Sequence, residues 1–211
     1  FSIPLIAISI VFAKPALFTL NPEYEKAYVV VIFLTGQVFL MTLVNTFSTF
    51  LMGIEKVDVK ESNFREFVKS KLFLMPTLSL IQFIIYLSTL VVTLILLSPN
   101  TPEIVLVKYW ASISFISQIP LTIYLFLKIK QNFNLKIEIK IILKYVAGAV
   151  LSFGIIFFIT DAYLEYNTNL IEFIPSLIIL VLFGILGYLG ITFVIDSKTR
   201  ELTYSIINEL K

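Results

Sequence analysis

The chain of 211 residues is 58% hydrophobic and only 14% charged, and its mean hydropathy is +0.96. A soluble domain carries roughly a quarter charged residues, so this composition excludes an ordinary water-soluble protein. The formal net charge is +2, and the chain contains neither cysteine nor histidine. Disulfides, thiolate nucleophiles, Cys/His zinc sites and histidine proton relays within the chain are therefore excluded.

Six apolar segments are long enough to cross a hydrocarbon core about 30 Å thick, which takes roughly 20 helical residues. Runs of this kind must be helical, because each backbone amide has to be satisfied within its own segment. The sequence therefore predicts an all-α, polytopic transmembrane bundle of about six helices. In chain order the predicted spans are Ser2 to Leu20 with a break at Lys14-Pro15, Ala27 to Gly53, Leu72 to Leu97, Ile104 to Leu127, Ile141 to Thr160 and Phe173 to Ile195.

The basic residues are concentrated in every second connection between these spans. Thirteen of the sixteen lie in residues 54–71, in residues 128–144 or in the tail after Ile195. By the positive-inside rule, these segments and the C-terminus face the cytoplasm. We therefore expect a multi-pass protein of the cell (plasma) membrane, with membrane lipids as partners.

Residues 1–195 are predicted to form the transmembrane bundle and residues 196–211 a cytoplasmic amphipathic tail. In the tail, Leu202, Ile206 and Leu210 are four residues apart and share one helix face, with Ser197 as a possible N-cap. The segment from Lys128 to Lys144 also alternates basic with apolar residues. Both segments are expected to anchor the bundle at the membrane surface, and regulation of transport through lipid headgroups is the alternative.

The pattern of ionisable residues predicts no enzyme. The fourteen acidic residues all fall in loops, tails or the ends of predicted helices, whereas a proton relay or cation site inside a membrane normally needs a carboxylate within a span. We expect no catalytic residues, no metal, no cofactor and no nucleic-acid partner. The lack of acidic metal-binding motifs at the helix ends also argues against a membrane-embedded glycosyltransferase.

Neutral polar residues recur on one face of three spans, where lipid tails could not satisfy them. Such faces line either a path for a polar substrate such as a sugar or contacts between helices. For the hydroxyls the second interpretation is favoured, because Ser and Thr often bond back to their own helix. For Asn45, Gln82 and Gln118 both stay open, because a buried amide is costly to leave unpaired. The full sets are Thr35, Thr42, Asn45, Thr46 and Thr49, then Ser79, Gln82, Tyr86, Thr89 and Thr93, then Ser114, Ser117, Gln118 and Thr122.

Three further features bear on motion, charge and packing. Pro120 lies deep in the fourth span and is predicted to kink it, which makes it a candidate hinge. Lys108 lies just inside the same span. The motif Gly148-x-x-x-Ser152 and the glycines Gly184, Gly187 and Gly190 predict close packing of the last two helices.

One stretch resembles a known family of transporters. Residues 12–27 read FAKPALFTLNPEYEKA, in which Leu17-Phe18 precedes a turn at Asn21-Pro22 that is followed by Tyr24 and Ala27. The next span ends in Leu51-Met52-Gly53-Ile54-Glu55-Lys56. In these features the chain resembles the polysaccharide flippases of the O-antigen and teichoic-acid type. Their superfamily also contains multidrug extrusion transporters and lipid II flippases.

The resemblance implies alternating access by two helical lobes that expose a central cavity to each side in turn. Family members have roughly 12 to 14 helices, and this chain would match the last six, so its first partner would be an N-terminal lobe of the same protein. A start at Phe1, within an apolar run, favours a C-terminal part of a longer chain. The implied substrate is a lipid-linked oligosaccharide. In such proteins basic residues of the cavity bind its diphosphate, and here Lys14 and Lys108 are the candidates. A small-molecule exporter of the same superfamily and a non-transporting membrane scaffold are the alternatives.

Overall fold

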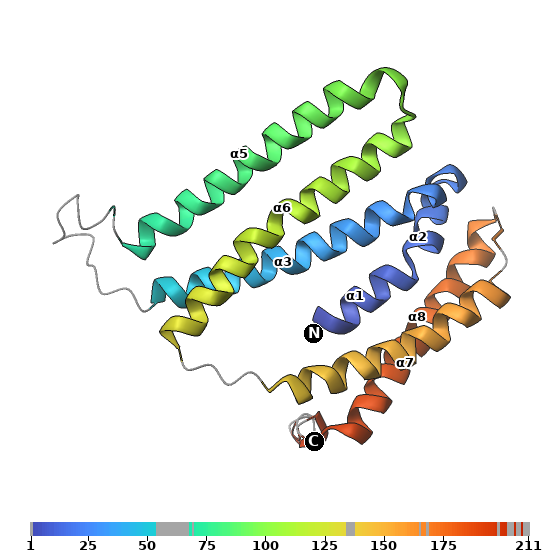
Figure 1. The fold of residues 1–211 in the computed structure, drawn as a ribbon. Helices are drawn as coiled ribbons and strands as arrows, with labels where there is room; N and C mark the ends of the chain where they lie inside the picture. The colour runs from blue at the N-terminus through green and yellow to red at the C-terminus, as the bar shows by residue number, and fades with distance from the viewer. Residues whose placement is uncertain are drawn as a thin grey trace. The chain divides into compact units, whose positions relative to one another are not determined.

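A computed structural model describes residues 2–53, 68, 70–133, 138–164, 166–167, 169–197, 199–201, 205 and 208. All regular structure in this part of the chain is helical, which confirms the predicted fold class. The helices are α1 (Ser2–Val11), α2 (Ala13–Leu20), α3 (Tyr28–Gly53), α5 (Lys71–Leu97), α6 (Glu103–Asn132), α7 (Ile139–Tyr163) and α8 (Leu170–Ile195), with 3-10 turns η1 (Pro22–Ala27) and η2 (Ser98–Asn100) (Figure 1).

The predicted number of spans is confirmed. Among the described residues, five helical segments are long and apolar enough to cross a membrane, and α1 with α2 makes a sixth if the pair is one span bent by 59°. The bend lies at Phe12, whose φ of −97° and ψ of 4° depart from the helix, two residues before the predicted break. Pro15 contributes to it, because it has no N–H to donate to the carbonyl of Val11.

The chain forms two compact units. Unit 1 comprises Phe1–Ile32 and Ile137–Lys211, and unit 2 comprises Phe33–Lys136. In unit 1, α7 and α8 lie side by side and α1 packs against α7 (Figure 1). The core of this unit is a cluster of apolar and aromatic side chains, with Phe12 from the bend between α1 and α2, Phe153 from α7 and Tyr188 from α8 at its centre.

Small residues allow α7 and α8 to approach closely, as the glycine pattern predicts. A methyl group added at Gly184 would lie 2.7 Å from Cε1 of Phe153, whose side chain is 1% exposed. The hydroxyl of Ser152 donates a hydrogen bond of 2.8 Å to the carbonyl of Gly184. A methyl group added at Gly190, by contrast, would meet nothing within 4 Å. Gly184 is therefore a packing position, and Gly190 is not.

A second cluster of unit 1 joins α2 and η1 to the connection between α7 and α8. The rings of Phe18, Tyr166 and Phe173 are packed with centroids 5.0 to 5.8 Å apart. The Lys14 ammonium lies 3.1 Å from a carboxylate oxygen of Glu25 and 5.3 Å from the centre of the Tyr166 ring. These contacts hold the short α2 helix in place.

In unit 2, α6 packs against both α3 and α5. Its buried residues Leu121, Leu125 and Ile129 form a core cluster with Val44 and Leu51 of α3 and Met75 of α5. Aromatic pairs extend the seam between α3 and α6, with ring centroids 6.0 Å apart for Phe33 and Phe115 and 6.1 Å apart for Phe47 and Phe126. The connection from α5 to α6 is short and passes through η2.

Two expectations about surface segments need correction. The segment from Lys128 to Lys144 does not form a surface helix of its own, because α6 continues to Asn132 and α7 already begins at Ile139. The helix after α8 is capped by Asp196 rather than Ser197, because the Asp196 carboxylate accepts the N–H of Thr199 and Ser197 is itself helical. The predicted apolar stripe of Leu202, Ile206 and Leu210 lies outside the described residues.

Candidate functional site

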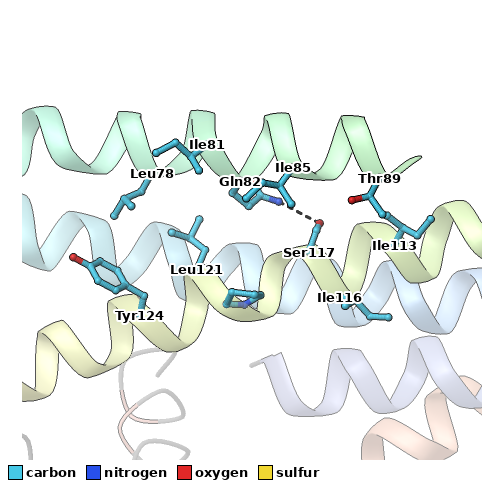
Figure 2. Close-up of a pocket in the computed structure, with 11 residues that line it drawn as sticks. Leu78, Ile81, Gln82, Ile85, Thr89, Ile113, Ile116, Ser117, Leu121 and Tyr124 are labelled. Atoms are coloured by element: carbon cyan, nitrogen blue, oxygen red, sulfur yellow. Dashed lines mark hydrogen bonds between the residues drawn. The ribbon is translucent and has the colours of Figure 1, made fainter. Parts of the chain in front are cut away.

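A groove of about 550 Å³ lies between α5 and α6 in unit 2. Near its middle, Nε2 of Gln82 donates a hydrogen bond of 3.3 Å to the hydroxyl of Ser117, and Figure 2 shows the two side chains pointing toward each other. Ser117 is at the centre of α6, and Gln82 is two residues from the centre of α5. The two polar groups therefore meet near the midplane of both spans.

The rest of the groove is mainly apolar, and none of its lining residues is charged. Thr89 and Tyr124 add hydroxyl groups toward its two ends, and Pro120 forms part of the α6 wall (Figure 2). The hydroxyl of Ser117 also donates 3.0 Å to the carbonyl of Ser114. The bond between Gln82 and Ser117 is a contact between α5 and α6, and a part for Gln82 in a substrate path stays a prediction.

Gln118 lies on the buried side of α6, and its side chain is 7% exposed. Its amide makes no side-chain hydrogen bond within the described part of the chain, although its backbone carbonyl accepts the hydroxyl of Thr122 at 2.9 Å. The one fully buried side-chain oxygen without a partner among the described residues is Oγ1 of Thr160, so the unpaired amide of Gln118 keeps some open surface. An unmatched amide at the centre of a span costs about 1–3 kcal/mol if fully desolvated, which favours a polar contact there.

A strip of polar residues on α3, which we call the α3 strip, consists of Thr42, Asn45, Thr46 and Thr49. All four side chains are exposed. Successive residues are about 100° apart around a helix, which puts the strip on the side of α3 away from the seam that Val44 and Phe47 make with α6. The strip therefore faces away from the rest of unit 2.

The hydroxyls of the α3 strip are satisfied within the helix itself. Thr42 donates to the carbonyl of Val38, Thr46 to that of Thr42 and Thr49 to that of Asn45, at 2.8 to 2.9 Å. This confirms the expectation that the hydroxyls bond back to their own helix. Asn45 differs from them, because its amide has no hydrogen-bond partner in the described part of the chain. Asn45 is thus the polar group of this strip that can bond to a group outside α3.

The other exposed helix surface of unit 2 is mostly apolar. On α5, large side chains such as Leu80, Ile84 and Leu96 are 53% to 73% exposed. Hydrocarbon tails can cover such a surface at no cost, whereas they cannot solvate an amide. The exposed apolar surface of α5 therefore suits lipid. The exposed amide of Asn45 on α3 requires polar surroundings.

The remaining candidates are Lys108, Lys14 and Pro120. Lys108 is half-buried in the second turn of α6 and has no acidic partner among the residues that the structure describes. Lys14 is already paired with Glu25 and stacked on Tyr166, so Lys108 is the better candidate for an anionic group. Helix α6 is continuous through Pro120, and the hinge role of this residue stays a prediction.

No family model matches the chain, and no curated protein or solved structure matches it either. The predicted substrate contacts also do not form one pocket, because Gln82 lines the α5–α6 groove while Asn45, Gln118 and Lys108 do not.

The Gln82–Ser117 bond yields a stability prediction. Polar pairs between membrane helices contribute about 0.6 kcal/mol on average, so a double-mutant cycle of Gln82→Leu and Ser117→Ala should give a coupling free energy near that value. The measurement is unfolding of the purified protein in bicelles. A cycle that pairs Ser117→Ala with Thr89→Val is the control, because Thr89 lines the same groove without a bond to Ser117. Equal coupling in the two cycles would contradict the assignment.

Proposed function

We propose that the chain is the C-terminal part of a flippase that moves a lipid-linked oligosaccharide across the membrane by alternating access. The observation that carries this proposal is the exposed α3 strip, with the unpaired amide of Asn45, in a span that otherwise suits lipid. A polar strip within a membrane span needs water, a polar substrate or a polar protein surface beside it. A central cavity between two lobes provides such surroundings.

The chemistry of the strip favours a neutral, hydroxyl-rich substrate headgroup. An amide both donates and accepts hydrogen bonds, which suits the hydroxyls of a sugar, and the strip contains no charged residue. A diphosphate requires cations, and Lys108 is the residue in unit 2 that we assign to it. The resemblance of residues 12–56 to polysaccharide flippases supports the same substrate class.

A reconstituted flip assay tests the proposal. The intact protein is placed in liposomes with a fluorescent lipid-linked oligosaccharide, and a membrane-impermeant glycosidase reports the headgroups that reach the outer leaflet. The proposal predicts translocation faster than in protein-free liposomes. If folded protein gives only the background rate, the flippase assignment is wrong. Transport of small amphipathic cations in the same liposomes would then favour the exporter alternative, and no transport of either kind would favour a scaffold.

A further inference from the structure

The junction between α8 and the segment that follows it contains a buried carboxylate. Helix α8 ends at Ile195, and its C-cap residue Asp196 has an extended backbone at φ −120° and ψ 118°. Its N–H still donates 2.9 Å to the carbonyl of Thr192, and its own carbonyl accepts the N–H of Arg200 at 3.3 Å. Asp196 is thus the last residue bonded to α8 and the first residue of the next helical segment, and it is only 5% exposed.

Three donors converge on one oxygen of this carboxylate. Oδ2 of Asp196 accepts the hydroxyl of Tyr145 at 2.7 Å, the hydroxyl of Thr199 at 3.1 Å and the N–H of Thr199 at 3.2 Å. Tyr145 belongs to α7, and its hydroxyl also lies 3.3 Å from that of Thr199. A single side chain therefore joins α7, the end of α8 and the first turn of the segment after it.

These donors replace the water that the buried carboxylate has lost. The hydroxyl of Tyr145 above all, with the hydroxyl and N–H of Thr199 and the charge of Lys144, holds the pKa of Asp196 below its ordinary value of 3.8, although burial acts in the opposite direction. The carboxylate is therefore ionised, and its hydrogen bonds are of the stronger, charge-assisted kind. Their stabilisation is present above pH 3.8 and is lost as the pH falls through the lowered pKa.

We infer that Asp196 is a three-way junction that makes the segment after α8 take its direction from α7. The N-cap bonds from Thr199 start a helix at this point, but neither of them involves α7. The Tyr145 hydroxyl links the same carboxylate to α7. A shift of α7 along α8 is thereby transmitted to the tail. This coupling does not depend on the identity of the substrate.

The two roles of Asp196 can be separated by substitution. Tyr145→Phe removes the bond to α7 and leaves both bonds from Thr199 in place, so it should change the direction of the tail while the first turn stays formed. Asp196→Ala removes all three bonds and should loosen the first turn as well. Tyr163→Phe is the matched control, since Tyr163 lies at the other end of α7, is 80% exposed and makes no hydrogen bond within the described residues.

The experiment uses the full chain in nanodiscs with spin labels at Leu143→Cys on α7 and Ser205→Cys in the tail. Both positions are exposed, and the chain has no native cysteine. Pulsed electron–electron double resonance gives the distribution of distances between the two spin labels. Hydrogen exchange at the Thr199 and Arg200 amides reports whether the first turn is formed. Tyr145→Phe should shift and broaden the distribution with unchanged exchange, and Tyr163→Phe should leave both unchanged. A Tyr145→Phe distribution that superimposes on the wild-type one overturns the inference, as does equal broadening by Tyr163→Phe.

Discussion

Replacing Asn45 with leucine should lower the rate of oligosaccharide translocation roughly tenfold, the equivalent of a lost hydrogen bond of about 1.4 kcal/mol. Asn45 is exposed on α3, and its amide is the polar group of the α3 strip that no other described residue satisfies. The substitution removes a donor and an acceptor from the proposed substrate path. It should leave the folded structure intact, because no internal hydrogen bond of the side chain is lost. The flip assay in liposomes measures the effect.

The control for this prediction is Met41→Leu, one turn away on α3. Met41 is also exposed, at 44%, but it is apolar and offers no hydrogen bond of comparable strength. It should retain the wild-type rate, and Asn45→Gln should retain part of it because the amide is kept. If Asn45→Leu transports as fast as Met41→Leu, the α3 strip does not contact the substrate.

The second large effect concerns stability. Gly184→Ala should lower the free energy of unfolding by about 1–3 kcal/mol, the cost of overpacking a filled core. The new methyl group would lie 2.7 Å from the ring of Phe153. That ring is itself fixed between α7 and α8 at 1% exposure, so α8 would have to move away from α7. Thermal unfolding of the purified protein measures the loss.

Gly190→Ala is the matched control for Gly184→Ala on the same helix. Gly190 is exposed, and an added methyl group meets nothing within 4 Å. Alanine is the better helix former by about 0.5–1 kcal/mol, so this variant should be as stable as the wild type or slightly more stable. A loss at Gly190 as large as that at Gly184 would show that helix packing does not explain the effect.

The spans could be predicted from the sequence because length and hydropathy determine them almost alone. Both ends of α5 and α8 lie within three residues of the prediction, and the polar helix faces follow from spacing within one helix. The pairing of Gln82 with Ser117 could not be predicted. It depends on the register between two helices, which packing along their whole length sets.

The ends of helices, like the helix pairing, depend partly on nearby residues and partly on residues far away in the sequence. Asp196 and Ser197 are both good N-cap residues, and sequence alone gave no reason to choose Asp196. In the structure the Asp196 carboxylate accepts the N–H of Thr199 and also the hydroxyl of Tyr145, which is 51 positions away in the sequence. The break that the sequence predicts at Lys14-Pro15 is two residues after the observed bend at Phe12. Pro15 indicates a break nearby, but the packing of Phe12 against α7 and α8 sets where the chain turns.

The proposed function requires the α3 strip to lie beside water inside the membrane. Because the chain has no cysteine, single cysteines at Thr42, Asn45, Thr46 and Thr49 can be labelled with a membrane-impermeant maleimide in the intact protein in its membrane. Leu80 and Ile84 of α5 supply the lipid-facing controls. Labelling is expected at the four strip positions and at neither of the two α5 positions. Strip positions that label no faster than Leu80 and Ile84 would contradict it.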